Sequence, residues 1–334
     1  MAPTPCSGEE RAAIDSLAAR LGEAGYVVDV EAFPSHSSSA PWLASYAALS
    51  VVAALLIYAV PLVAAALGGI AVVLHARESE GRPLVRRWTG TSHNVVARSP
   101  VAAVPEAVVV AHVDSAPHSA FDGHARRALV VTLQTLMAGV PAAAAAAWVA
   151  EAGRELPSSV AAAGVAAAVA LALLTLVLYR PPAPNELAVE PSAADVLVAL
   201  APALRESPAW LVGTGSRTAG MIGMQAFLAA HAREVAGAAW LNLEAGPPGS
   251  VVAASEEGTW RERRADRGLM GAAEEAGADV RPYRAAPTDA TVLLARRRRA
   301  LTLLVPPGEQ EAAAAIGTAV VAAALDAGIP TPPG

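Results

Sequence analysis

Three long stretches of the chain carry no charged side chain, and the first covers residues 41–74. As one straight helix this stretch would be about 51 Å long, whereas the hydrocarbon core of a bilayer is roughly 30 Å thick. Pro61 lies near its middle and interrupts helical hydrogen bonding. The pattern therefore predicts a membrane hairpin over 41–75, with helices at about 41–58 and 60–75.

The other two uncharged stretches are 128–149 and 157–179. Each run is long enough to span a bilayer, and the polar turn 151–157 separates them. We therefore expect a second membrane hairpin over 128–179. Buried core helices are the alternative, because alanine runs such as 142–147 are only weakly hydrophobic.

The remaining sequence alternates between the two periodicities of regular secondary structure. Helical spacing and a Ser7–Glu10 capping box predict a first helix over 7–24. Apolar runs predict strands, and the run over 107–111 suits a buried parallel sheet. The expected strands are 26–33, 95–97, 107–111, 209–213, 238–243 and 300–305, and the further helices are 192–205, 219–233, 265–276 and 309–327. This alternation predicts an α/β fold with a doubly wound, mostly parallel sheet.

Two hairpins return the chain to the same side of the membrane each time. The pieces 1–40, 76–127 and 180–334 are therefore expected to form one domain. The second hairpin's tip carries only Arg154, whereas the other side is flanked by Arg77, Arg82, Arg86, Arg87, Arg126, Arg127 and Arg180. The positive-inside rule then predicts an integral protein of the cell (inner) membrane whose main domain is cytoplasmic.

Composition agrees with this prediction and excludes some classes of protein. Hydrophobic residues make up 54% of the chain and charged residues 16%, against about 25% charged residues in a typical soluble domain. A net charge of −6 argues against nucleic acid as a partner. The single cysteine, Cys6, excludes an intrachain disulfide and a cysteine-based zinc cluster. We expect no signal peptide, because residues 7–24 are amphipathic.

Short motifs in the outer pieces resemble, in order, those of the clan MH zinc exopeptidases, the group of bacterial aminopeptidases and glutaminyl cyclases. Their Gly-Tyr-x-Val strand, Asn-Val-Ile-Ala strand and His-Tyr-Asp-Ser strand end resemble residues 25–28, 94–97 and 112–115. Their Ser-Gly helix start resembles Ser192-Ala193, and their Thr-Gly-x-Glu-Glu turn resembles residues 214–218. Their Asn-Leu-Asp and Thr-Asp motifs resemble residues 242–244 and 288–289.

This resemblance implies a site for two zinc ions at the ends of the strands, with a glutamate as general base. Matched residue by residue, His112 and Glu244 stand at metal-ligand positions and Asp114 at the position that orients a ligand. Other positions of the expected pocket differ from the family pattern. Val189 replaces the bridging aspartate and Glu190 its asparagine neighbour, Arg217 and Thr218 replace the two glutamates, and Asp289 lies in the Thr-Asp loop. No histidine follows His231, so the family's last ligand is absent.

These replacements predict a protein without a catalytic base, because Arg217 occupies the base position. Losing a base alone costs roughly 10²–10⁴ in rate. We therefore expect no cofactor, or zinc if any metal binds. The expected function is a membrane-anchored pseudo-peptidase that acts as a binding or assembly module, with the lipid bilayer and an unidentified protein or peptide as partners. The alternatives are a divergent active hydrolase that uses a single metal with His112, Asp114, Glu244 and Glu190, and a membrane scaffold or transport subunit.

Other polar groups have simpler interpretations. The stretch His112, Asp114, His118, Asp122 and His124 is either a small metal site or a polar loop leading to a membrane helix. The basic run 296–299 contacts either solvent or anionic lipid headgroups. The pairs Glu256-Glu257 and Glu274-Glu275 lie away from the motif positions and are expected on the surface.

Overall fold

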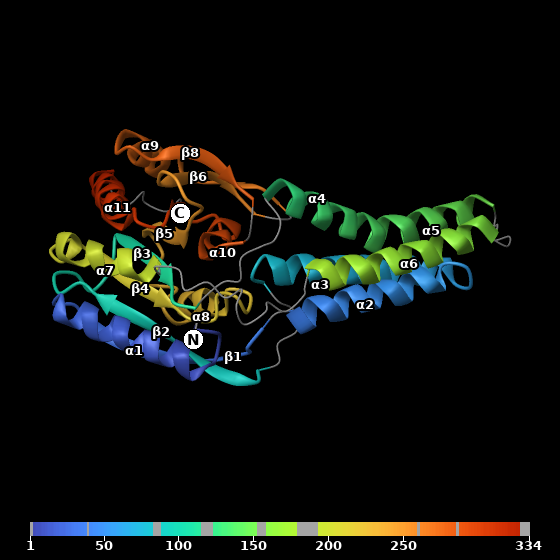
Figure 1. Cartoon of the computed structure of the whole chain (residues 1–334), viewed down its shortest axis with the longest axis horizontal. Helices are drawn as coiled ribbons and strands as arrows, with labels where there is room; N and C mark the ends of the chain where they lie inside the picture. The colour runs from blue at the N-terminus through green and yellow to red at the C-terminus, as the bar shows by residue number, and fades with distance from the viewer. Residues whose placement is uncertain are drawn as a thin grey trace. The chain divides into compact units, whose positions relative to one another are not determined.

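A computed structural model describes residues 3–38, 40–82, 88–114, 123–151, 158–178, 193–258, 261–284 and 287–327. The chain divides into two compact units, which are described separately (Figure 1). The first unit comprises Met1–Ser38, Arg87–His118 and Pro184–Gly334. The second comprises Ser39–Arg86 and Ser119–Ala183.

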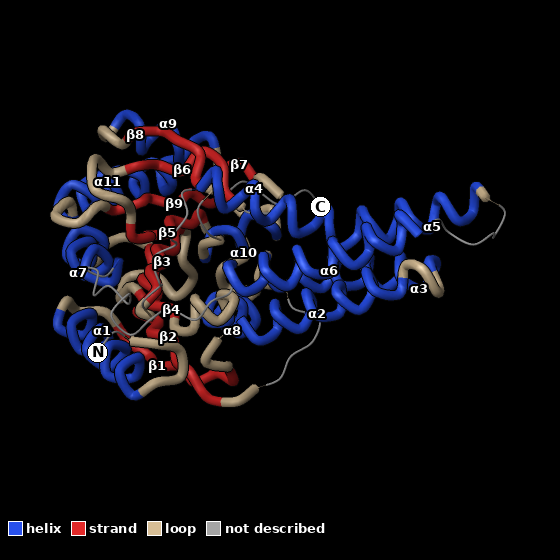
Figure 2. The backbone as a smooth tube through the Cα atoms, turned by 45° about the vertical axis from the view of Figure 1, so that its right-hand side comes forward, coloured by secondary structure: helices blue, strands red, loops and turns tan. Residues whose placement is uncertain are grey.

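The first unit is built around a nine-stranded sheet with the order β1-β2-β4-β3-β5-β9-β6-β7, and β8 pairs with β6 (Figure 2). The strands are β1 (Val27–Ser35), β2 (Gly90–Arg98), β3 (Ala107–His112), β4 (Ala209–Thr214), β5 (Ala239–Ala245), β6 (Val252–Glu257), β7 (Arg263–Arg264), β8 (Asp279–Tyr283) and β9 (Ala300–Val305). The four central strands β4, β3, β5 and β9 run parallel to one another.

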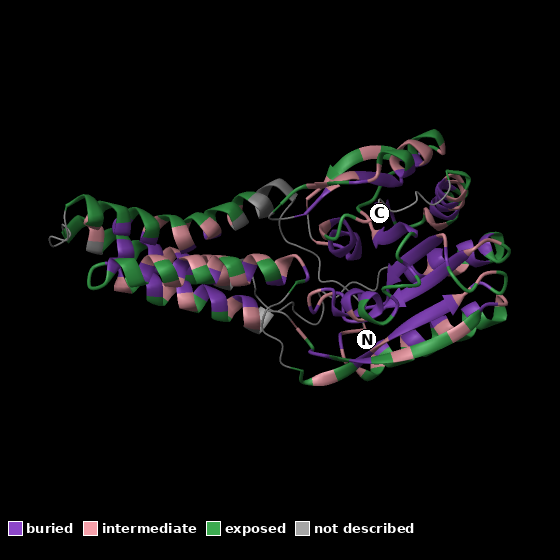
Figure 3. Ribbon diagram, turned by 180° about the vertical axis from the view of Figure 1, so that it is seen from behind, coloured by how far each residue is buried: buried purple, intermediate pink, exposed green. Residues whose placement is uncertain are grey.

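Alternate residues of the central strands form two apolar cores, because successive side chains of a strand point to opposite faces. On one face, Val109, Leu211 and Leu241 pack with residues of α1 (Gly8–Glu23), α7 (Ala193–Leu204), α9 (Arg267–Glu275) and α11 (Gln310–Asp326). On the other face, Trp210 and Trp240 pack with α8 (Ile222–Ala230) and α10 (Asp289–Ala295). The central strands are buried along their length (Figure 3).

The expected α/β class is confirmed, but the expectation of a mostly parallel sheet holds only for the central strands and for the pair β6–β8. Among the described strands, β1–β2, β2–β4, β6–β7 and β6–β9 pair antiparallel. The sheet is therefore mixed. The short strands β6, β7 and β8 and helix α10 were not predicted. The strands are short and contain charged residues such as Glu256 and Arg281, and α10 has only seven residues.

The second unit is helical. Its elements are α2 (Ala40–Leu56), α3 (Pro61–Ser79), α4 (Gly123–Gln134), the π-helical turn η1 (Thr135–Gly139), α5 (Val140–Ala150) and α6 (Ser158–Leu178). Among the described residues, three helices are long and apolar enough to cross a membrane: Pro61–Ser79, Val131–Ala150 and Ser158–Thr175. The helix predicted at 41–58 forms as α2, which is apolar but shorter.

A close helix contact explains the π-helical turn. Pro141 has no N–H to donate to the carbonyl of Met137, four residues earlier. That carbonyl faces Gly68 of α3, where an added Cβ would lie 2.3 Å from it. The buried residues of α3 are Pro61, Ala64, Gly68, Ala71, His75 and Glu78. Around Gly68 these residues are small, which allows the two helix backbones to approach closely.

Candidate functional site

One face of the parallel strands changes from apolar to polar toward the carboxyl ends of the strands. On β4, Trp210 and Val212 are followed by Thr214, and on β5 Trp240 is followed by Asn242 and Glu244. His112 ends β3 and pairs in register with Thr214, and Thr302 of β9 pairs with Asn242. All of these polar side chains are buried. The carboxyl ends of parallel strands are where α/β folds present functional groups.

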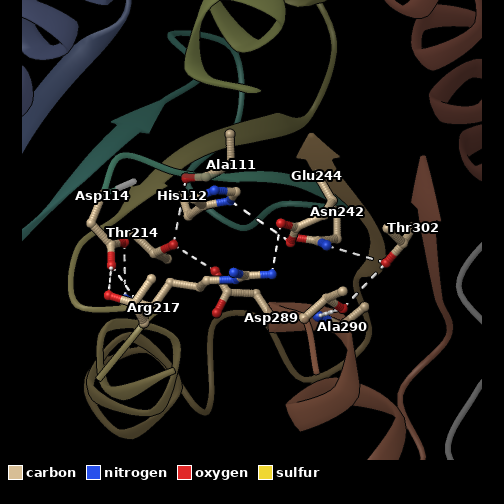
Figure 4. Close-up of polar contacts among 12 residues, drawn as sticks. Ala111, His112, Asp114, Thr214, Arg217, Asn242, Glu244, Asp289, Ala290 and Thr302 are labelled. Carbon is tan, nitrogen blue, oxygen red and sulfur yellow. Dashed lines mark hydrogen bonds and ion pairs between the residues drawn. The ribbon is translucent and has the colours of Figure 1, made fainter. Parts of the chain in front are cut away.

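A buried ion pair between Arg217 and Glu244 lies at the centre of this region (Figure 4). The Arg217 Nη2 donates to Glu244 Oε1 at 2.7 Å, and both side chains are more than nine-tenths buried. Burial opposes the guanidinium charge, but nearby Glu244, Tyr283, Asp114 and Asp289 together raise the pKa of Arg217 above its ordinary value. The site therefore contains a permanent positive charge.

Four successive backbone amides hold the loop that carries Arg217, which connects β4 to α8. Gly215 N donates to Asn94 Oδ1 at 3.2 Å and Ser216 N to Glu10 Oε1 at 2.7 Å. Asp114 accepts from Arg217 N at 3.0 Å and from Thr218 N at 2.8 Å. A run of amides directed at anionic groups is a backbone anion site, and here the carboxylates of Glu10 and Asp114 accept from three of the four amides, while the neutral Asn94 accepts from the first.

The same loop has a backbone that few sequences tolerate. Ser216 and Met221 adopt positive φ angles of 52° and 58°, which cost non-glycine residues free energy. A Cβ at Gly215 would lie 2.5 Å from Ser92 Oγ, and a Cβ at Gly223 would lie 2.2 Å from the Gly215 carbonyl oxygen. The loop is therefore held in a single arrangement that directs Arg217 toward Glu244.

His112 lies beside the ion pair. Its Nδ1 is 3.8 Å from Glu244 Oε2, too far for a hydrogen bond. Burial and, second, the charge of Arg217 lower the pKa of His112 to about 4, against the opposing effect of Asp114. The imidazole is therefore neutral at neutral pH.

Two further carboxyl groups complete the site. Thr214 Oγ1 donates to Asp289 Oδ2 at 2.5 Å, and Thr288 Oγ1 donates to Glu257 Oε2. Asp289 Oδ1 and Glu257 Oε1 are buried without a hydrogen-bond partner among the residues that the structure describes. Burial raises the pKa of both carboxyl groups to about 7, although their threonine partners oppose the shift.

The structure brings together His112, Asp114, Arg217 and Glu244, four of the residues singled out from the sequence. Thr218 donates its hydroxyl to Asp114 at 2.7 Å, and Asp289 lies in the same network through Thr214. Val189 and Glu190 lie outside the described residues, as do His118 and Asp122.

Sequence reasoning missed three polar groups of the site. Glu257 was expected on the surface, but it is fully buried. Glu10 was interpreted only as a helix cap, whereas its side chain also binds Ser216 N and Ser92 Oγ. Asn94 was matched only as part of a strand motif, but it holds Gly215. For Glu257 the sequence carried no usable signal, because the strand β6 that buries it was itself not predicted.

The site residues that the structure describes do not fit a pair of zinc ions. Within the described ranges, no three His, Cys, Asp or Glu side chains are arranged to hold a metal ion. The Arg217 guanidinium, 2.7 Å from Glu244 Oε1, lies where a cation would need that carboxylate. A metal ion placed there would be repelled by the like charge of Arg217.

No protein-family model matches this sequence, and no curated protein matches it. Solved structures of similar fold include an aminopeptidase from Aneurinibacillus sp. strain AM-1, which is 14% identical in sequence. The match covers 97% of this chain and 90% of that chain, with a TM-score of 0.49. A zinc aminopeptidase from Bacillus subtilis has 10% identity, coverage of 96% and 90%, and a TM-score of 0.49. The glutaminyl cyclase of Macrostomum lignano has 11% identity, coverage of 98% and 86%, and a TM-score of 0.45. These similarities concern the fold alone.

Proposed function

We propose that this protein is a membrane-anchored, catalytically inactive relative of the zinc exopeptidases that acts as a binding or assembly module. The observation that supports this proposal is the buried ion pair of Arg217 and Glu244. It places a guanidinium beside the carboxylate that the family resemblance assigns to a metal.

The surrounding groups support the same proposal. A hydrolase of this kind needs a metal-bound water and a carboxylate base next to it. At the base position the chain has Arg217, which can neither accept a proton nor bind a cation. Its neighbour Thr218 donates to Asp114. The loop is thus arranged around an arginine, and its hydrogen bonds hold that arginine in place.

The helical unit gives the proposed module its anchor in the lipid bilayer. Apolar side chains remain exposed along these helices, among them Leu55, Leu62, Ile70, Val165 and Leu173. Lipid would cover such surfaces favourably. From the arginine distribution we propose that the peptidase-like domain, residues 1–40, 76–127 and 180–334, is cytoplasmic and meets its protein or peptide partner there. Labelling of a cysteine introduced at position 250, in intact cells, tests this topology. If an impermeant external reagent labels this cysteine, the domain lies on the outer side of the membrane.

Metal analysis and activity assays test the proposed inactivity. The full-length protein, purified in detergent without chelator, is analysed for metal and assayed on a panel of aminoacyl-anilides with added zinc or cobalt. We expect less than one equivalent of tightly held metal and no turnover above a heat-denatured control. Two equivalents of metal, with zinc-dependent turnover that is lost in His112→Ala, would overturn the proposal.

A divergent hydrolase remains a second candidate because of one observation. The buried carboxyl groups of Asp289 and Glu257 have pKa values raised to about 7, and acid–base catalysis is most efficient with a group that titrates near the working pH. Turnover of any substrate that is lost in both Asp289→Asn and Glu257→Gln would favour this candidate. Absence of turnover in the wild-type protein would exclude it, and turnover that survives both substitutions would show that Asp289 and Glu257 are not its acid or base.

A further inference from the structure

One edge of the sheet is a long strand that has no neighbouring strand on its outer side among the described residues. β1 is the first strand in the order of the sheet, and all nine of its residues, Val27–Ser35, pair with β2 on its inner side (Figure 2). The other end of the sheet has shorter strands, because β7 has two residues and β8 has five. The outer side of a long edge strand presents N–H and C=O groups that can pair with another chain.

The hydrogen bonds of β1 show which of its residues face outward. The carbonyl of Ser35 accepts from the amide of Thr89, on the side of β2. The backbone groups of successive strand residues point to opposite sides of the strand, so those of Val28, Val30 and Ala32 point away from β2. Among the residues that the structure describes, none of these three takes part in a backbone hydrogen bond outside the β1–β2 pair.

This outward row fits a short extended segment. From Val28 to Ala32 the row is about 13 Å long, at roughly 3.3 Å per residue. Its three residues each offer one donor and one acceptor, which makes six possible hydrogen bonds. Pro34, the next outward residue, has no N–H and ends the row of donors. An added strand of about five residues would therefore use the whole row.

The side chains of β1 give this edge an acidic face. Asp29 and Glu31 lie on the same face of the strand, where both contact Arg98, and Glu31 also contacts His231. Glu234 is a second carboxylate on His231. Three carboxylates thus meet one arginine and one histidine, so their net charge is −1 with the histidine protonated and −2 with it neutral. An added strand is therefore favoured if it carries basic side chains on this face.

The same charges disfavour a second copy of this chain as the added strand. Three antiparallel registers of two β1 strands pair at least two outward residues of each copy. They place Asp29 opposite Asp29, Asp29 opposite Glu31, or Glu31 opposite Glu31. Like charges directly opposite each other destabilise a sheet. The charges therefore favour a different, basic chain.

From these observations we infer that the outer edge of β1 binds an extended segment of a partner protein, which adds as a further strand and alternates apolar and basic residues. Its apolar residues lie opposite Val28, Val30 and Ala32, and its basic residues lie opposite Asp29 and Glu31. The inference rests on the proposed function as a binding module. It goes further by assigning the partner a backbone conformation and a charge.

A synthetic peptide tests the inference from the partner's side. Acetyl-Thr-Val-Arg-Val-Arg-Val-Thr-amide with a fluorescent label is titrated with the full-length protein in detergent, and binding is followed by fluorescence anisotropy. We expect saturable binding. N-methylation of the three valines removes the N–H groups that would face β1 and should weaken binding at least about tenfold. N-methylation of the two arginines is the matched control, because their N–H groups would point away from β1, and it should leave the affinity unchanged.

Variants of the edge test the same contacts from the protein's side. Val30→Pro removes one outward N–H at a position where an edge strand tolerates proline, and it should weaken binding at least about tenfold. Asp29→Lys should weaken binding of the arginine peptide and strengthen binding of the same peptide with glutamate in place of arginine. This charge reversal keeps the test valid if Val30→Pro does not fold. Asp279→Lys, which changes an exposed aspartate of β8, is the control and should alter neither affinity.

Three outcomes would overturn the inference. They are no saturable binding by the folded wild-type protein, equal affinities of the parent and valine-methylated peptides, and equal effects of Asp29→Lys and Asp279→Lys. Light scattering that shows a wild-type dimer, dissociated by Val30→Pro, would assign the edge to a second copy and would also overturn it. Failure of the proposed function differs from all of these, because it would appear as metal and turnover in the wild-type protein.

Discussion

The carboxylate of Asp114 accepts a hydrogen bond from the backbone amide of Arg217 at 3.0 Å, although Asp114 lies 103 positions earlier in the chain. The second oxygen binds both the amide and the hydroxyl of Thr218. Asp114, which follows the end of β3, thus holds the loop that connects β4 to α8. That loop in turn holds Arg217, the cation of the site. Asp114 therefore acts on the site through the backbone of the loop that carries Arg217.

Asp114→Asn is expected to destabilise the protein by about 1–3 kcal/mol. The amide NH₂ of asparagine would face at least one of the backbone N–H donors, which leaves a buried donor unsatisfied. Equilibrium unfolding of the full chain in detergent measures the change. Ser250→Ala is a suitable control, because it removes only an exposed hydrogen bond to Asp279. Equal effects of the two substitutions would contradict the role assigned to Asp114.

Glu244→Gln is expected to destabilise the protein by about 3–5 kcal/mol, because it leaves the Arg217 charge buried without its partner. The double variant Arg217→Met/Glu244→Gln, which has no buried charge at this pair, should recover much of the loss. The exposed pair Arg281–Asp279 is the control, where Arg281→Ala should cost at most about 1 kcal/mol. A double variant no more stable than Glu244→Gln would show that the carboxylate does not act through Arg217.

The regular part of the fold could be predicted from the sequence because its signals are local. The first helix, with Ser7 as its cap, forms at Gly8–Glu23, and the apolar run at 107–111 forms β3. The antiparallel edges could not be predicted, because strand direction depends on distant pairings such as Val252 with Leu304. Periodicity within one segment contains no information about such a pairing.

The candidate site was only partly predictable for the same reason. His112, Asp114 and Glu244 follow strands, so their position at a sheet edge could be inferred from order alone. Glu10 could not, because its helix-cap position gives no sign that its carboxylate reaches Ser216, 206 residues later. Glu257 looked like one of two adjacent surface charges, and only the packing of β6 against β9 and β8 shows that it is buried.

Glu257→Gln is expected to change how stability depends on pH. Because the folded-state pKa is about 7 and the ordinary value is 4.5, the folded protein keeps a proton that the unfolded chain releases between these pH values. The contribution of Glu257 to the free energy of unfolding of the wild-type protein therefore falls as pH rises from about 4.5 to about 7. The free energy of unfolding of Glu257→Gln, relative to that of wild type, should therefore rise by on the order of 3 kcal/mol between pH 4.5 and pH 8.

His112→Gln provides the opposite trend as an internal control. The pKa of His112 is lowered to about 4, so the unfolded chain binds a proton below about pH 6.5 that the folded protein does not. Relative to wild type, His112→Gln should therefore gain stability as pH falls from about 6.5 to 4. Unfolding free energies measured at several pH values test both variants. Parallel curves for the two variants would contradict the electrostatic description of the site.

Two adjacent glycines of α3 allow a test of the helical unit that does not depend on the site. At Gly68 an added Cβ would lie 2.3 Å from the Met137 carbonyl oxygen and 3.3 Å from Pro141 Cγ. Neither the backbone carbonyl nor the proline ring can move without displacing η1 and α5. At Gly69 an added Cβ meets no atom within 4 Å.

Gly68→Ala should therefore lower the free energy of unfolding in detergent by at least about 2 kcal/mol. Gly69→Ala should be neutral or stabilising by up to about 1 kcal/mol, because alanine favours helix. Loss of helical circular dichroism on denaturant titration measures both variants. Equal stability of the two variants would show that α3 does not pack against the π-helical turn through Gly68.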